Sequence, residues 1–246
     1  MSAPPSAGVP DAARTAELRS RLTEVCDRID RACMTSRRDP AEVHLVVVTK
    51  YFPSSDVRAL ASLGVADIGE NRDQEAAEKI AELADLRGRL TVHFIGQLQT
   101  NKASSVAGYA DVVHSVDRPK LVRALDKGAA RAGRRLAALV QVDLRDQESG
   151  GGRGGASPEQ AAALADAVAD SEHLVLRGVM AVAPLGADPA PGFARLREVA
   201  DGIRARHPQA NWISAGMSGD LEAAVAHGAT HLRVGSAILG SRPPLR

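Results

Sequence analysis

Short apolar runs alternate along the chain with longer segments of helical periodicity. The run HLVVVT at 44–49 has no polar alternation, which is typical of a strand buried on both faces of a parallel sheet. Before it, apolar residues recur every three or four positions from Thr15 to Arg37, so an amphipathic helix is expected there. The full set of predicted strands is 44–49, 65–69, 91–95, 111–114, 136–142, 174–180, 212–213 and 231–234.

Helical patterns separate all of these predicted strands. They cover 53–63, 73–86, a short segment near Lys102, 117–132, 157–169, 191–206 and 220–226. Such alternation indicates a parallel sheet with right-handed crossovers. Eight units in 246 residues favour closure into a single (β/α)8 TIM-type barrel of the α/β class, with an extra N-terminal helix. An open doubly wound sheet would need a glycine-rich turn after the first strand, and 49–53 (TKYFP) contains no glycine.

Two segments fall outside this pattern. Residues 1–13 are rich in Pro, Ala and Ser without periodicity, so we expect a disordered tail and a single barrel domain over 14–246. Residues 145–157 (RDQESGGGRGGAS) contain five glycines and no apolar anchor, which predicts a flexible surface loop. Because this segment follows the fifth strand, a mobile lid at the carboxyl-terminal rim of the barrel is the alternative.

The composition narrows the classes of partner. With 31 basic and 30 acidic residues the formal net charge is +1, so there is no basic excess to neutralise a nucleic-acid backbone. No apolar run approaches the length of a membrane span, and the first residues do not read as a secretory signal. Cys26 and Cys33 lie two helical turns apart, too far for a disulfide. We therefore expect a cytoplasmic protein, and a monomer, because no long apolar surface is evident outside the barrel pattern.

Lys50 is the first candidate for chemistry. It ends the first strand on the same face as Val46 and Val48. If that face is the barrel interior, the apolar surroundings lower the pKa of the ammonium and make it a ready nucleophile for an aldehyde. The alternative is a lysine that leaves the strand into solvent.

The segments after the last two strands could hold a phosphate group. The segment 213–220 (ISAGMSGD) has small residues and a natural helix N-cap in Ser218, and Gly235 and Ser236 follow the eighth strand. Loops at these two places form the phosphate site of many barrels. Arg233 shares a face with Gly235, so its guanidinium could pair with a pyridine nitrogen that then stays unprotonated. A surface ion pair is the simpler interpretation of Arg233.

Other polar residues also follow strands. Glu70 and Asn71 come after the second strand, and His93 lies in the third. A lone histidine in a strand is more often a satisfied core residue than a ligand. Metal-binding spacings of His and Cys are absent from the sequence.

Six stretches of the chain resemble one known family. The chain is similar to the YggS/PROSC-type pyridoxal phosphate (PLP) homeostasis proteins, which share the barrel of the alanine racemase N-terminal domain. The stretches are VVVTKYFP (46–53), IGENRDQE (68–75), HFIGQLQTNK (93–102), SVDRPKL (115–121), LRGVMAVAP (176–184) and ISAGMSGDLEAAVAHGATHLRVGSAILGSR (213–242). They occur in the family's order and span essentially the whole folded chain.

The resemblance implies PLP as cofactor and roles for eleven residues. Lys50 corresponds to the lysine that carries PLP as a Schiff base, and Arg233 to the partner of the pyridine nitrogen. The implied phosphate loops contain Ser214, Gly216, Met217, Ser218, Gly235 and Ser236, and the implied pocket-lining positions are Asn71, His93 and Met180. The chain departs from the family after the fifth strand, where Asp143 and the glycine-rich segment replace the usual residues.

Three functions follow from these observations. The first is a PLP carrier in intracellular PLP homeostasis without robust catalysis, which hands the cofactor to apo-enzymes transiently. The second is an amino-acid racemase, which needs a second acid or base opposite the lysine. Alternation turns Tyr51 to the other side of the strand, and Tyr109 precedes the fourth strand, so neither tyrosine is expected to serve. The third is a Schiff-base enzyme for a phosphorylated metabolite, with Glu70 and Asp143 as its carboxylates.

Overall fold

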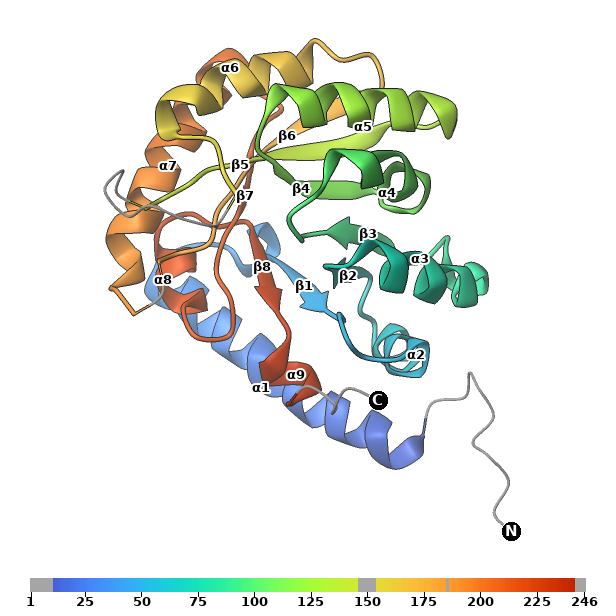
Figure 1. Ribbon diagram of the computed structural model, residues 1–246. Helices are drawn as coiled ribbons and strands as arrows, with labels where there is room; N and C mark the ends of the chain where they lie inside the picture. The colour runs from blue at the N-terminus through green and yellow to red at the C-terminus, as the bar shows by residue number, and fades with distance from the viewer. Residues whose placement is uncertain (1–10, 146–153, 185, 242–246) are drawn as a thin grey trace.

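The computed structural model describes residues 11–145, 154–184 and 186–241. Eight parallel strands form a closed barrel in which each strand pairs with its neighbours in the sequence and β8 returns to β1 (Figure 1). The expected barrel is therefore confirmed. The strands are β1 (His44–Val48), β2 (Asp67–Glu70), β3 (Thr91–Phe94), β4 (Val112–Val116), β5 (Leu136–Gln141), β6 (Leu174–Met180), β7 (Trp212–Ser214) and β8 (His231–Val234), within two residues of the predicted bounds.

Helices follow each strand and surround the barrel (Figure 1). They are α2 (Ser54–Ser62), α3 (Asp73–Glu82), α4 (Ala103–Tyr109), α5 (Pro119–Arg131), α6 (Pro158–Ala169), α7 (Pro189–Arg206), α8 (Leu221–Ala226) and α9 (Ser236–Leu239), with single 3-10 turns η1 (Pro40–Glu42), η2 (Ala84–Leu86) and η3 (Thr100–Lys102). The start of α6 shows how the sequence sets such a boundary, because Ser157 and Gln160 form a capping box around Pro158. Among the described helices, none has both the length and the apolarity to cross a membrane.

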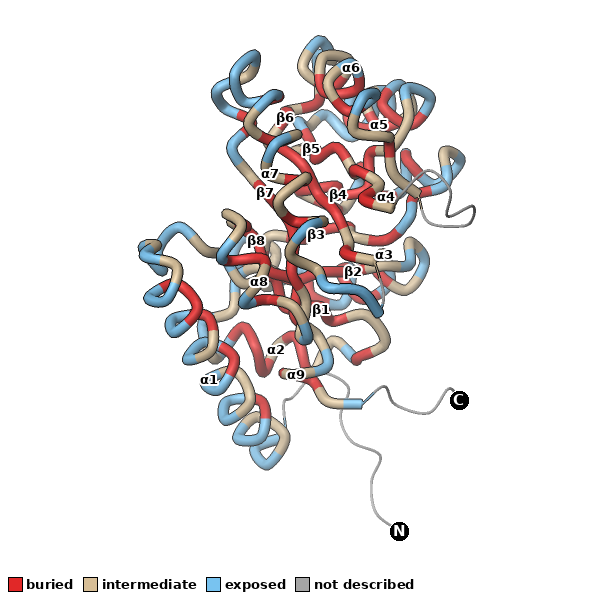
Figure 2. Tube along the Cα trace, turned by 90° about the vertical axis from the view of Figure 1, so that its left-hand side faces the viewer, coloured by how far each residue is buried: buried red, intermediate tan, exposed pale blue. Residues whose placement is uncertain are grey.

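Most residues of the strands are buried, as their apolar runs predict (Figure 2). Val47 packs outward in the layer that contains Leu60 of α2. Val46 and Val48 therefore face the interior, and a second group inside the barrel contains Val112, Leu139 and Met180. The interior is also unusually polar, because it encloses His93, His114, Ser214, His231 and Arg233.

The extra N-terminal helix, α1 (Ala12–Thr35), packs against α2, α8 and α9 and covers the side of the barrel near β1 and β8 (Figure 1). It begins three residues earlier than the periodicity predicts, because the Asp11 side chain accepts a hydrogen bond from the amide of Ala13 and caps it. The predicted tail thus loses residues 11–13, and residues 1–10 lie outside the described part. Both cysteines of α1 are free thiols, with Cys33 buried and Cys26 exposed.

Most of the predicted glycine-rich loop, residues 146–153, lies outside the described residues. Its C-terminal end is described, and Ala156 makes a parallel bridge to Val142 beyond the end of β5. This bridge places the end of the segment at the carboxyl-terminal mouth of the barrel.

Candidate functional site

Lys50 lies at the carboxyl-terminal mouth of the barrel, two residues beyond Val48. Its side chain is partly exposed. Val48 pairs with Gly69 of β2, so Lys50 and Asn71 lie at the same level of neighbouring strands. A side-chain carbon on Gly69 would lie 3.2 Å from Cγ1 of Val46 and 3.5 Å from Cγ2 of Val48, which leaves little space below the lysine. Lys50 therefore occupies the position that its place in the sequence predicts.

The turn after Lys50 is strained. Tyr51 has a φ of 71°, in the left-handed region that costs a non-glycine residue about 1–2 kcal/mol. Its amide donates a hydrogen bond to the Glu75 carboxylate, which helps to hold this conformation. The Tyr51 ring centroid lies 5.8 Å from Nζ of Lys50. The expectation that Tyr51 turns away from Lys50 is wrong, because the strand ends at Val48 and the positive φ interrupts the alternation.

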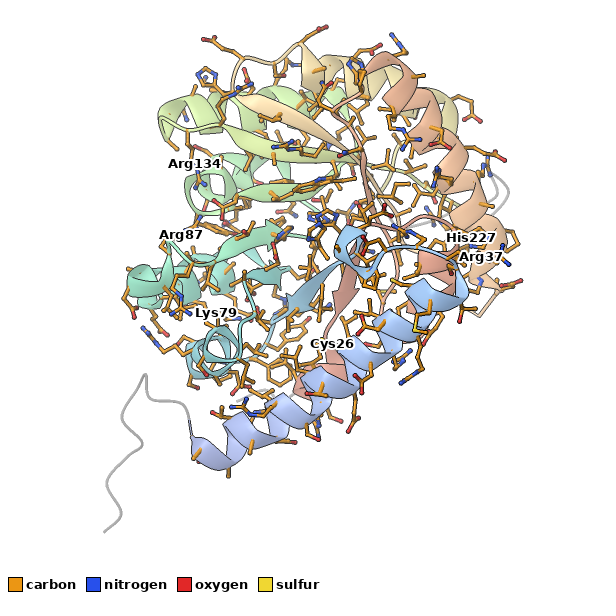
Figure 3. The ribbon with its side chains drawn as sticks, turned by 180° about the vertical axis from the view of Figure 1, so that it is seen from behind. Cys26, Arg37, Lys79, Arg87, Arg134 and His227 are labelled. Atoms are coloured by element: carbon orange, nitrogen blue, oxygen red, sulfur yellow. The ribbon has the colours of Figure 1, made fainter. Side chains whose placement is uncertain are left out.

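Behind this turn lies a buried ion pair that the sequence analysis did not foresee. Lys79 lies on α3 (Figure 3). Its Nζ lies 2.8 Å from Oε1 of Glu70 and 2.9 Å from the carbonyl oxygen of Thr49. Thr49 also donates its hydroxyl to Glu70 at 2.6 Å. Burial raises the pKa of Glu70, and the bonds from Lys79 and Thr49 oppose that rise. Glu70 thus supports the Lys50 turn from outside the barrel wall, and its predicted alternative use as a pocket carboxylate is wrong.

Arg233 lies inside the barrel, where it is 4% exposed. Its Nη1 donates to Oγ of Ser214 at 2.6 Å and its Nη2 to the carbonyl oxygen of Ala181 at 2.9 Å. These bonds account for two of the five N–H donors of a guanidinium. Burial lowers the pKa of Arg233 to about 10, so it is still a cation at neutral pH. The simpler interpretation of Arg233 as a surface ion pair is wrong.

His93 has both ring nitrogens engaged in the interior. Its Nδ1 lies 2.8 Å from Nε2 of His114, and its Nε2 lies 2.9 Å from Oδ1 of Asp67. The residue is fully buried. This environment matches a satisfied core histidine, which is the simpler of the two expectations for His93.

The loops after β7 and β8 meet at the carboxyl-terminal mouth. Oγ of Ser236 lies 3.4 Å from Oγ of Ser218. Gly216 has a φ of 90°, and a side-chain carbon there would lie 2.6 Å from Cβ of Ala224, so only glycine fits without strain. Ser218 is not the helix N-cap that the sequence suggests.

Asp220 takes the N-cap position of α8 instead. Its side chain accepts a hydrogen bond from the amide of Met217 at 2.6 Å, which closes the turn one residue before the helix begins. The amide of Met217, one of the predicted phosphate donors, is therefore engaged within its own loop. Gly235 precedes α9, a four-residue helix that the sequence analysis did not predict.

The two remaining predicted pocket residues line separate hollows at the same mouth. Asn71 lines a hollow of about 530 Å³ together with Phe94 and Gln97. Met180 lines a cavity of about 230 Å³ whose wall includes Gln97 and Asp143. Gln97 belongs to both, so the two spaces adjoin across the end of β3.

The same mouth thus holds an amine, a buried guanidinium below it and two loops of small residues. Tyr109 does not belong to this site. It packs between the outer helices, and burial raises the pKa of its hydroxyl well above the ordinary value.

Comparison with known proteins shows the family to which the chain belongs. The family described as alanine racemase, N-terminal domain, matches residues 55–243. A pyridoxal phosphate homeostasis protein of Corynebacterium glutamicum is 41% identical over 223 residues, which cover 88% of this chain and 98% of the relative. The protein of the same description from Escherichia coli K12 is 34% identical, covering 92% of this chain and 97% of the relative. The chain belongs to the family of pyridoxal phosphate homeostasis proteins, on the barrel fold of the alanine racemase N-terminal domain.

A solved structure of a related protein contains the cofactor. PipY of Synechococcus elongatus PCC7942, with PLP bound, superposes with a TM-score of 0.77 at 34% identity and covers 91% of this chain and 100% of its own. The alanine racemase of Streptomyces coelicolor, at 19% identity and a TM-score of 0.72, shares the fold. The residues present here fit such a cofactor, because they offer a partly exposed amine, a buried cation and a glycine-dependent loop within one mouth.

Proposed function

We propose that this chain binds PLP as a Schiff base on Lys50 and serves in PLP homeostasis as a carrier of the cofactor rather than as an amino-acid racemase. PLP supplies a reactive aldehyde and an electron-withdrawing pyridine ring. The observation that carries the proposal is the placement of Lys50 above the buried guanidinium of Arg233 at the mouth of one barrel. The PLP-bound PipY structure supports the choice of cofactor.

Lys50 supplies the amine in this proposal. The strained turn at Tyr51 limits the directions in which the lysine can leave the strand. The hydrogen bond from the Tyr51 amide to Glu75, and the bond from Lys79 to the carbonyl of Thr49, tie both flanks of Lys50 to α3. The backbone on both sides of Lys50 is thus held in place before the cofactor arrives, which reduces the entropy that binding costs.

Arg233 and the two loops recognise the rest of the cofactor. The guanidinium would donate to the ring nitrogen without giving up its proton, so the nitrogen would stay largely unprotonated and the ring would be a weak electron sink. Ser218 and Ser236 offer hydroxyl groups from two loops to the phosphate, and the small residues Gly216 and Gly235 let the backbone approach it. We assign Ser214 to orienting Arg233, since its hydroxyl accepts from Nη1.

A weak electron sink favours a carrier, because racemisation passes through a carbanion that the ring must stabilise. A racemase also needs a second acid or base. Of the two tyrosines in the sequence, Tyr109 packs outside the barrel, and Tyr51 lies beside Lys50. Tyr51 is thus the residue on which the alternative depends, and Tyr51→Phe is the variant that separates the two functions.

The test of cofactor binding is the visible spectrum of the purified protein with added PLP, followed by borohydride reduction and peptide mass mapping. We expect a yellow protein with the reduced pyridoxyl group on the Lys50 peptide, and loss of both in Lys50→Ala. Lys127→Ala is the matched control, because Lys127 is an exposed lysine on α5 that lines neither of the two hollows at the mouth. A protein that takes up no PLP, or that is labelled only at other lysines, would refute the proposal.

The test of carrier against racemase uses the same preparation. We expect no alanine racemisation above the rate of free PLP, and no change in that rate in Tyr51→Phe. Mixed with a PLP-dependent apo-enzyme, the loaded protein should restore the activity of that enzyme, whereas borohydride-reduced protein should not. Robust racemisation that Tyr51→Phe abolishes would establish the alternative.

A further inference from the structure

A continuous chain of hydrogen bonds crosses the barrel interior below the candidate site. From Arg233 the bonds run to Ser214, at 2.6 Å, and on to Nδ1 of His114, at 2.9 Å. They continue through His93, at 2.8 Å, to Asp67, at 2.9 Å. The four inner side chains are at most 4% exposed, whereas the Asp67 side chain is 31% exposed. Because Asp67 is the first residue of β2, the chain of bonds ends at the amino-terminal mouth of the barrel.

The chemistry of its two ends gives this chain one direction. A guanidinium can only donate, so the oxygen of Ser214 accepts from Arg233 and its hydroxyl hydrogen is left for Nδ1 of His114. Nε2–H of His114 then donates to Nδ1 of His93, and Nε2–H of His93 donates to the carboxylate of Asp67. With a neutral His93 ring, the opposite direction would turn the lone pair of Nε2 toward that carboxylate, which repels it.

The charges of the chain agree with this direction. Burial holds the pKa of His114 well below its ordinary value, so the ring is neutral. Burial also raises the pKa of Asp67, but the bond from His93 and the nearby rings of His231 and His44 outweigh this effect and lower it overall. Each bond dipole therefore points from the cation at one end to the anion at the other, an arrangement in which hydrogen bonds strengthen one another.

We propose that Asp67, His93, His114 and Ser214 are positioning residues that act in series to orient Arg233, so that a carboxylate at the amino-terminal mouth influences the opposite, carboxyl-terminal end of the barrel. The direction of the chain is a property of the protein alone. Its consequence for PLP rests on the proposed function. The hydroxyl hydrogen of Ser214 is donated to His114. The lone pairs of the Ser214 oxygen therefore face Arg233 and hold the guanidinium in one orientation.

The first experiment needs no cofactor. Side-chain ¹⁵N NMR of the protein at pH 7.5 distinguishes the two tautomers of each histidine, and His114→Gln and His93→Gln identify the two signals. We expect both rings to carry hydrogen on Nε2 and none on Nδ1. A ring of either residue with hydrogen on Nδ1 would overturn the proposed direction, whether or not the protein binds PLP.

The second experiment measures the dissociation constant of PLP, from its absorbance, in variants of the two ends of the chain. Removal of a buried hydrogen bond to a charged group predicts a constant about tenfold higher in Ser214→Ala and about threefold to tenfold higher in Asp67→Ala. Asp67→Asn keeps an acceptor for His93 and should recover most of the affinity. In the proposal Asp67 acts only through Ser214. The double variant Asp67→Ala with Ser214→Ala should therefore bind PLP no more weakly than Ser214→Ala alone. If the two losses of PLP affinity add up instead, the proposal is overturned.

A matched control lies outside the barrel. His207 and Asp166 pair at 2.8 Å between α6 and α7, so Asp166→Ala removes the carboxylate partner of another histidine and should leave PLP affinity unchanged. If the unaltered protein binds no PLP, the proposed function fails while the NMR result still decides the direction of the chain. If it binds PLP and Asp67→Ala binds equally well, the positioning role fails alone.

Discussion

Replacement of Lys79 by Met should destabilise the protein strongly and in a pH-dependent way. The substitution keeps most of the apolar volume of the side chain and removes its charge. Glu70, which is fully buried, then keeps Thr49 as the remaining hydrogen-bond partner in the described structure, and its Oε2 already has none there. Because Nζ of Lys79 also contacts the carbonyl oxygen of Thr49 and, at 3.3 Å, Oε1 of Glu75, the pH dependence of the loss reports on Glu70 more directly than its size does.

The expected loss is about 3–5 kcal/mol of unfolding free energy at pH 8, the usual cost of breaking a buried ion pair on one side. The loss of unfolding free energy cannot exceed the cost of protonating Glu70, because a protonated carboxyl group needs no counter-charge. For a carboxyl group of ordinary pKa this cost is about 5 kcal/mol at pH 8. Burial raises the pKa of Glu70 in the folded protein, so the stability linked to this group is present at low pH and is lost as the pH rises through the folded pKa. Loss of Lys79 raises this pKa further. The difference between the variant and the unaltered protein should therefore be small near pH 4 and largest at pH 8.

The assay is urea unfolding of the cofactor-free protein at several pH values, followed by the fluorescence of Trp212, the single tryptophan. Adding Glu70→Gln to Lys79→Met should restore most of the loss at pH 8, because the amide needs no counter-charge. Arg58→Met is the control, since its partner Asp85 is 61% exposed and the loss should be barely measurable. A pH-independent loss, or a double variant no more stable than Lys79→Met, would refute the reasoning.

Three further predictions concern other parts of the structure. Gly216→Ala should cost about 1–3 kcal/mol in urea unfolding because of its positive φ and the close Ala224 side chain, whereas Gly219→Ala, with open space around it, should cost little. Asp111→Asn should destabilise the protein at pH 7. Burial raises the pKa of Asp111, but its hydrogen bonds and arginine partners lower this pKa overall. The difference in stability between the variant and the unaltered protein should therefore vanish as the pH falls through the folded pKa of Asp111. Thermal melts at several pH values can follow this difference. In thiol labelling of the folded protein, Cys26 should react and Cys33 should not until the protein unfolds; equal rates would contradict the packing of α1.

Much of the architecture could be predicted because its causes are local. Runs of apolar residues without alternation identify strands that are covered on both faces, and the 3.6-residue period identifies the helices between them. Lys50 and Arg233 could likewise be placed, because the period of two along a strand decides which side chains share a face. Ser218 and Tyr51 were misplaced where that regularity ends, one at a helix start that Asp220 caps and the other in a turn with positive φ.

The contacts between distant segments were decided by tertiary structure alone. The residues next to Glu70 in the sequence do not indicate that Thr49 and Lys79 will be its hydrogen-bond partners. The three residues meet only when α3 packs on β1 and β2. Likewise, His114 and Ser214 lie one hundred residues apart and come within hydrogen-bond distance because the barrel closes. The sequence by itself thus determined the barrel and the strand ends that carry the candidate site. Closure of the barrel determined which buried polar groups became partners, since a polar group inside it must find its hydrogen bonds among whatever side chains the opposite strands present.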